Sequence, residues 1–339
     1  MPKPKVLLAW SVSPEERAVV DSLWPGDVEV VDLQTRDAEV LMPVMPEIDV
    51  LVGFMNAEML ARADRLKLVH VLGHGVDFLQ RPGMREPMLE RGIKVANAKA
   101  GAICIAEFAI MSMIALTRRA FKFHEELAYR GGRLQDVRRR RMEGAIGGEL
   151  YGSTLGILGF GAIGQEIAIR ARAFGMTIGV VRRNPAKVDL KEYGVSFTAT
   201  LDDLDAFLGR CDYLVLALPS TPDTRDVLTR DRFQKIKDGA FLVNIARGSL
   251  VDEQALYEAL ASGKLAGAGL DVWRERDDSS PRDYPIPYPI HHYNVIMTPH
   301  YSGSTREARL RALRTVGENL RRFANGEPLI NEVDLEIGF

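Results

Sequence analysis

The sequence predicts an α/β protein with two domains, each built around a doubly wound parallel sheet. Its 339 residues are too many for one ordinary hydrophobic core. Short apolar runs alternate with amphipathic stretches from end to end, which is the rhythm of strand–helix units around a parallel sheet. After a glycine-containing basic loop, that rhythm starts again at TLGILGFGAIG, residues 154–164.

Five strands and one long helix are expected before this restart. The strands are the apolar runs KVLLAW, VEVVDL, DVLVGF, KLVHVLG and KVANA. The helix is expected at 105–130 and ends at Gly131-Gly132. We place a first domain at residues 1–100, with a flavodoxin-like sheet.

Six strands are expected after the restart: TLGILGF, TIGVVRR, DYLVLALP, AFLVNIA, AGAGLDVW and NVIMTPH. Six parallel strands complete a dinucleotide-binding sheet of the Rossmann type, which we place at residues 101–303. A last helix starts with Ser304 and Glu307, spaced as a capping box, and runs to Asn325-Gly326. The segment 304–339 is expected to pack back on the first domain.

Composition argues against several classes of partner. The formal net charge is −2 and no apolar stretch approaches the ~20 residues of a membrane span, so we expect neither nucleic acid nor membrane as a partner. The basic run at 138–141 is better explained as a solvated loop. Cys104 and Cys211 lie in apolar runs, as expected for buried reduced thiols, and no metal site is predicted. We expect a cytoplasmic protein.

The stretch GILGFGAIGQEIA predicts a cofactor site. Gly159, Gly161 and Gly164 form G-x-G-x-x-G between a strand and a helix. The first glycine makes a tight turn, the second lets the backbone approach a pyrophosphate, and the third lets helix and strand pack closely. The N–H groups and dipole of the helix N-terminus then bind the phosphates.

The end of the next strand indicates which dinucleotide is bound. Arg182 stands where an acidic residue would bind the ribose of NAD, with Arg183 and Asn184 beside it. Guanidinium groups bind a 2′-phosphate as bidentate pairs, whereas an acid would repel it. The sequence therefore predicts a preference for NADP(H), with NAD(H) possible. Exposed arginines at a strand end are the alternative.

Three more side chains follow strands of this domain. NIARG places Arg247, LDVW places Asp271 and TPH places His300 at the ends of successive strands, the edge where open α/β sheets bind ligands. With GHGVD at 73–77, NAKAGAICIAE, the glycine motif and LALPSTPDT at 216–224, they make seven ordered motifs. The sequence resembles the D-isomer-specific 2-hydroxyacid dehydrogenase family over nearly its whole length.

The resemblance implies an enzyme with its active site in the cleft between the domains, where hydride passes between the nicotinamide and the carbon of a 2-keto acid. Arg247 would bind the substrate carboxylate and carbonyl, and His300 would donate the proton to the carbonyl oxygen. Asp271 would orient the nicotinamide carboxamide. Backbone N–H groups near Gly75 and Val76 would bind the substrate carboxylate from the other domain.

The resemblance also implies further cofactor contacts and a homodimer. The additional cofactor-binding positions are Ala162, Ile163, Leu218, Pro219, Thr224, Ala246, Ser302 and Gly303. The expected partner is a small 2-keto or D-2-hydroxy acid, such as glyoxylate or hydroxypyruvate.

The sequence departs from the family pattern at one position. The glutamate that pairs with the catalytic histidine is replaced by Arg276, with Glu275 before it and Asp277 after it. Either Glu275 or Asp277 reaches His300 through a changed loop, or His300 works without a carboxylate. In the second case, which we favour, reduction should weaken as pH rises through about 6.5.

The sequence leaves two further questions open, the role of His74 and the choice among alternative functions. His74 either faces the substrate or is a solvent-facing loop histidine. Oxidation of another small anion such as phosphite, or nucleotide sensing without turnover, are alternative functions. Arg247 and His300 argue against a pure sensor, because sensing requires neither group.

Overall fold

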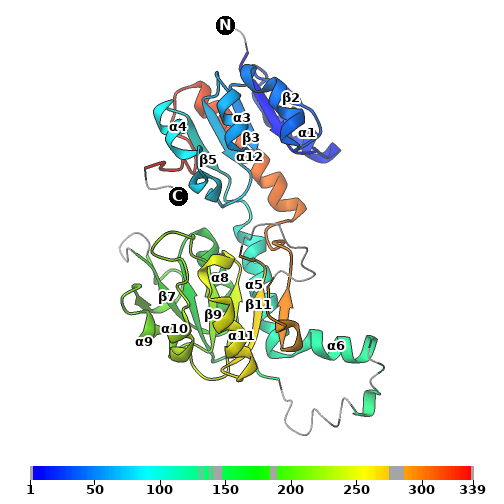
Figure 1. Ribbon diagram of the computed structural model, residues 1–339, viewed down its shortest axis with the longest axis vertical. Coiled ribbons are helices and arrows are strands. Elements are labelled where there is room, and N and C mark those ends of the chain that lie inside the picture. The colour runs from blue at the N-terminus through cyan, green and yellow to red at the C-terminus, as the bar shows by residue number, and fades with distance from the viewer. Residues whose placement is uncertain are drawn as a thin grey trace. The chain divides into compact units, whose positions relative to one another are not determined.

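The computed structural model describes residues 3–129, 131, 133–136, 139, 147–183, 189–274 and 286–336. The chain divides into two compact units, Met1–Gly101 with Gly303–Phe339, and Ala102–Ser302. Each has its own parallel sheet flanked by helices (Figure 1). The predicted α/β class with two doubly wound sheets is confirmed.

The first unit contains a five-stranded sheet of order β2-β1-β3-β4-β5, the flavodoxin-like arrangement. Its strands are β1 (Lys5–Ala9), β2 (Glu29–Asp32), β3 (Val50–Gly53), β4 (Leu68–Val71) and β5 (Lys94–Asn97), as predicted. Its helices before β5 are α1 (Pro14–Leu23), α2 (Ala38–Leu41), η1 (Met42–Glu47), α3 (Ala57–Arg62), η2 (Asp77–Gln80) and α4 (Arg85–Glu90). The inner strands are mostly apolar because both faces of the sheet are covered, and His70 of β4 is a buried polar exception.

Helix α12 (Arg306–Ala324) belongs to this unit and packs against α1. The Trp24 indole N–H donates to the Leu313 carbonyl at 3.0 Å, and Leu313 lies in the core beside β1. The predicted capping box is wrong by one residue, because the cap is Thr305, whose side chain accepts from the Ala308 N–H. Both Ser304 and Thr305 are good cap residues, so only the backbone decides between them.

The second unit contains a seven-stranded parallel sheet of order β12-β11-β10-β9-β6-β7-β8. The strands are β6 (Thr154–Leu158), β7 (Thr177–Val181), β8 (Val195–Ala199), β9 (Tyr213–Leu216), β10 (Ala240–Asn244), β11 (Leu265–Leu270) and β12 (Val295–Met297). All six predicted strands are present. The seventh, β8, was missed because it is a half-exposed edge strand, VSFTA, without a continuous apolar run.

The single helix predicted at 105–130 is two helices, α5 (Ala102–Thr117) and α6 (Ala120–Ala128). Arg119 between them has a left-handed backbone with φ 51°, and its N–H bonds the Leu116 carbonyl three residues back, which ends α5. The other helices of the unit are α8 (Ala162–Ala173), α9 (Leu204–Leu208), α10 (Arg230–Lys235), η4 (Gly248–Leu250), α11 (Glu253–Ala261) and η5 (Ile290–His292).

Candidate active site

The glycine motif lies between β6 and α8, and its three glycines have different surroundings. A Cβ on Gly159, whose φ is 100°, would lie 2.5 Å from the Ala217 carbonyl oxygen. A Cβ on Gly164 would lie 2.3 Å from the Gly159 oxygen, so both glycines are required by packing. At Gly161 no atom of the described residues lies within 4 Å of the Cβ position. Gly161 therefore leaves open space, as the approach of a pyrophosphate requires.

The N-terminus of α8 meets this loop. Gly161 is its N-cap residue and makes no side-chain cap, and Ala162 and Ile163 form the first turn. The first N–H groups of a helix have no partner within the helix, so they form an anion site reinforced by the helix dipole. The loop and helix fit the diphosphate of a dinucleotide.

Arg182 follows the last residue of β7 and lies beside the same loop. Its guanidinium carbon is 6.0 Å from the centre of the Phe160 ring, within the motif. Its Nη1 is buried and has no hydrogen-bond partner among the described residues. A buried guanidinium N–H without an acceptor is costly, so this atom fits an anionic ligand. Arg183 is exposed, and Asn184 lies outside the described residues.

The loop after β9 carries three of the predicted cofactor contacts. Leu218 is half-buried and Pro219 is exposed, so both can meet a ligand. The buried Thr224 hydroxyl accepts from the Thr221 N–H at 2.8 Å and donates to the Pro219 carbonyl at 2.7 Å. Thr224 therefore shapes the loop from inside.

Arg247 lies at the end of β10 on a segment fixed by Asn244, which sequence reasoning missed. The buried Asn244 amide donates to the Arg247 carbonyl at 2.9 Å and accepts from the Ala246 N–H at 3.1 Å. The Arg247 guanidinium is half-buried and donates to the Ala246 carbonyl at 2.6 Å. A Cβ on the next residue, Gly248, would lie 2.1 Å from the Trp273 backbone, so this segment packs tightly against the residues after β11.

Asp271 follows β11 and ties down the loop that carries His300. Its fully buried carboxylate accepts hydrogen bonds from the Thr298 hydroxyl at 2.6 Å, the Tyr301 N–H at 2.7 Å and the Ser302 N–H at 2.9 Å. Its carbonyl accepts from the His300 N–H at 2.7 Å. The carboxylate thus has a role in loop structure that the sequence did not reveal.

His300 is exposed and held in a left-handed backbone conformation, with φ 58°. A non-glycine residue in this region persists only where its surroundings impose it, and Asp271 supplies those surroundings. Glu275, Arg276 and Asp277 lie outside the described residues, so both predicted alternatives for a carboxylate partner of His300 stay predictions.

In the first unit, the residues 73–76 follow β4. Val76 is buried, and His74 and Gly75 are half-buried. The Asn97 side chain, at the end of neighbouring β5, donates to the His74 carbonyl at 2.7 Å. Sequence reasoning did not single out Asn97, although a polar residue ends an apolar strand there. Gly303 begins the C-terminal part of this unit.

Two further searches cover the described residues. No group of three or more His, Cys, Asp or Glu side chains there could hold a metal ion. No helix among them combines the length and the apolar character needed to cross a membrane.

Comparison with known proteins agrees with this geometry. Residues 110–302 match the NAD-binding domain of the D-isomer-specific 2-hydroxyacid dehydrogenases. The chain belongs to this family. It is therefore a relative of oxidoreductases and contains a domain for a nicotinamide cofactor. The resemblance drawn from the seven motifs is confirmed.

Individual family members are similar over most of this chain. D-3-phosphoglycerate dehydrogenase of Methanocaldococcus jannaschii is 37% identical over 91% of this chain and 56% of its own length. Hydroxypyruvate reductase of Thermotoga maritima is 36% identical over 80% of this chain and 83% of its own. The crystal structure of a glyoxylate reductase from Paecilomyes thermophila has a TM-score of 0.75 and 27% identity, covering 99% of this chain and 100% of that one. The chain spans a little over half the length of the phosphoglycerate dehydrogenase.

Proposed function

We propose that this protein reduces a small 2-keto acid to the D-2-hydroxy acid with NADPH, and catalyses the reverse oxidation with NADP. The family supports the reaction class, and the reductases among its relatives support the substrate class. The observation that carries the cofactor preference is the buried Arg182 Nη1, which has no acceptor among the described residues.

The residues of the second unit have separate roles in this proposal. The nicotinamide, when bound, supplies the hydride to the substrate carbonyl carbon. Arg247 binds the carboxylate and carbonyl oxygens through paired N–H groups. His300 gives its proton to the carbonyl oxygen as that oxygen gains charge. The Asn244 and Asp271 side chains hold the segments that carry these two groups.

The dinucleotide phosphates would be held by the loop 159–164 and the first turn of α8, and the 2′-phosphate by Arg182 with Arg183. Backbone N–H groups of residues 74–76 would bind the substrate carboxylate, as a turn rich in N–H groups can.

We also propose a homodimer. The surface of α5 and α8 exposes large apolar side chains around a hollow, among them Met111, Ile114 and Phe174. Contiguous exposed apolar surface of this kind marks interaction sites. Sedimentation velocity at several protein concentrations measures the assembly.

The function is tested by following NADPH and NADH oxidation with glyoxylate, hydroxypyruvate and other 2-keto acids at several pH values. We expect the ratio of kcat/KM for NADPH over NADH to fall roughly tenfold to a hundredfold in Arg182→Ala, because one charge-assisted phosphate pair is lost. Arg172→Ala is the matched control, since Arg172 is exposed and bonds the Glu192 carbonyl.

An unchanged cofactor ratio in Arg182→Ala would contradict the NADP preference. Tight NADPH binding without oxidation by any 2-keto acid would instead support the sensing alternative. Activity that persists well above neutrality would contradict the alternative in which His300 works without a carboxylate partner.

A further inference from the structure

The segment after α12 returns to the first unit's sheet. Glu332 pairs with Ala96 as an antiparallel bridge, and the Val333 N–H donates to the Val95 carbonyl at 2.8 Å. The Asn97 N–H donates to the Asn331 carbonyl at 3.2 Å. The segment 327–335 therefore covers β5, which is an edge strand of the five-stranded sheet.

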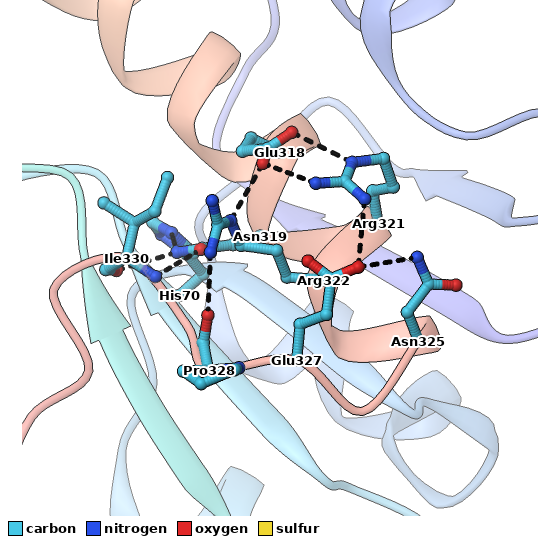
Figure 2. Close-up of polar contacts among 9 residues, drawn as sticks. All are labelled: His70, Glu318, Asn319, Arg321, Arg322, Asn325, Glu327, Pro328 and Ile330. Atoms are coloured by element: carbon cyan, nitrogen blue, oxygen red, sulfur yellow. Dashed lines mark hydrogen bonds and ion pairs between the residues drawn. The ribbon is translucent and has the colours of Figure 1, made fainter.

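A buried cluster of hydrogen bonds, here called the polar clamp, joins Asn319, His70 and Ile330 just before the residues that pair with β5. Asn319 of α12 accepts from the Ile330 N–H at 2.8 Å and donates to the Ile330 carbonyl at 3.0 Å. These two bonds set the orientation of the amide, so the Asn319 NH2 group faces His70 Nε2 at 2.9 Å (Figure 2). His70 Nε2 must then be an unprotonated acceptor, and Nδ1–H donates to the Val71 carbonyl at 3.2 Å. His70 is wholly buried on β4.

From this clamp, two asparagines lead to residues 73–76. The Asn331 side chain donates to the Asn97 carbonyl at 3.2 Å. The Asn97 side chain, 5% exposed, donates to the His74 carbonyl at 2.7 Å. A hydrogen-bonded path thus runs from the C-terminal segment through the end of β5 to the turn that follows β4.

The turn needs such support. Gly73 and Gly75 flank His74, and glycine gives the backbone more conformational freedom than any other residue. N–H groups bind a carboxylate well only when they are already held in the binding geometry. The Asn97 bond fixes the peptide that joins His74 to Gly75, and with it the direction of the Gly75 N–H.

We propose that Asn97 is a positioning residue for the substrate-binding turn 73–76, and that the C-terminal segment 327–335 holds Asn97 in place. This inference rests on the proposed function, because it assigns the turn to the substrate carboxylate. It adds a role for Asn97, Asn331 and the C-terminal segment. Asn97 is the first residue of the motif NAKAGAICIAE, but the resemblance assigned it no role, and Asn331 and the segment lie outside all seven motifs.

The test compares Asn97→Ala and Asn331→Gly with the wild type. Asn97→Ala removes the bond to His74. Asn331 has φ 54°, which glycine adopts freely, so Asn331→Gly removes only the side-chain bond to Asn97. Lys94→Gln is the matched control, since it breaks the Lys94–Glu332 ion pair of 3.1 Å between the same segments without touching Asn97.

In Asn97→Ala we expect KM for the 2-keto acid to rise about tenfold, while kcat changes less than about threefold. The Kd of NADPH should stay unchanged, because the dinucleotide-binding groups belong to the second unit. Asn331→Gly should raise KM about threefold, and Lys94→Gln should leave it unchanged. Cooperative unfolding of Asn97→Ala shows that the variant is folded. If its KM then lies within about twofold of the wild-type value, the proposal is overturned.

Hydrogen exchange at the amides of residues 73–77 is measured on the same proteins and requires no substrate. Faster exchange in Asn97→Ala and Asn331→Gly than in Lys94→Gln supports the proposal, and equal rates overturn it. If no 2-keto acid is reduced by the wild type, the proposed function fails, and this measurement still decides whether Asn97 holds the turn.

Discussion

In the second unit, the loop that carries His300 is tied to one buried carboxylate with three donors, whereas in the first unit the turn at 73–76 is tied to the neutral amide of Asn97. Hydrogen bonds to a charged acceptor are roughly twice as strong as neutral ones. In our proposal the loop with the charged acceptor carries the proton donor and the turn at 73–76 binds the substrate, so we expect the loop to be held more firmly than the turn. A catalytic proton donor needs one fixed position, while a binding turn tolerates adjustment to its ligand.

The largest effect is expected from Asp271→Asn. An amide in this position offers one acceptor atom and turns its NH2 group toward a backbone N–H donor, that of Tyr301 or of Ser302, so the free energy of unfolding should fall by about 3 kcal/mol or more without cofactor. We expect kcat to fall roughly a hundredfold, as His300 loses its fixed place. Urea unfolding and steady-state kinetics measure the two effects.

Asp238→Asn is the control for this change, because Asp238 is exposed and pairs with Lys264 at the surface. Unchanged stability with a large loss of NADPH affinity in Asp271→Asn would show that the carboxylate acts on the cofactor, as the family resemblance implies, and would remove the contrast between the units.

The second effect concerns pH and the first unit alone. Burial lowers the pKa of His70 from its ordinary 6.5 to about 4. Between these values the unfolded chain binds a proton that the folded chain does not, so stability is complete above about pH 6.5 and falls as pH drops toward 4. The expected loss is about 3 kcal/mol. Urea unfolding followed by tryptophan fluorescence reports it, since two of the three tryptophans, Trp10 and Trp24, lie in this unit.

His70→Gln removes the titrating group, so its unfolding free energy should depend less steeply on pH over the same range. Equal slopes for the two proteins would mean that His70 is not the group that responds. His70→Gln should leave the hydrogen exchange of the His300 loop unchanged between pH 6.5 and 4, because that loop is held by Asp271 of the second unit.

The smallest effect is expected at Gly161, where the second unit leaves space for a ligand. Gly161→Ala adds a Cβ in open space, so stability without cofactor should be unchanged, while NADPH affinity falls about tenfold as the backbone loses its close approach. Gly164→Ala is the contrasting variant, since its Cβ would meet the Gly159 oxygen and destabilise the protein itself. Titration calorimetry and thermal unfolding separate the two. A loss of stability in Gly161→Ala would contradict a role in binding alone.

Local patterns predicted much of this molecule. All five strands of the first unit and six of the second contain short apolar runs, and the runs are longest in the inner strands, which are buried on both faces. The edge strand β8 and the break at Arg119 were not predicted. The half-exposed sequence VSFTA of β8 has no continuous apolar run, and a single left-handed residue leaves no periodic signal.

The sequence by itself determined the two parallel sheets, the glycine loop before α8 and the arginine at the end of β7, because each depends on residues that are neighbours in the chain. Only the tertiary structure decided that Asp271 holds residues 27 to 31 positions away and that Asn331 supports Asn97 across 234 positions. Such bonds depend on which strands are adjacent and in which register, and no local pattern contains that information.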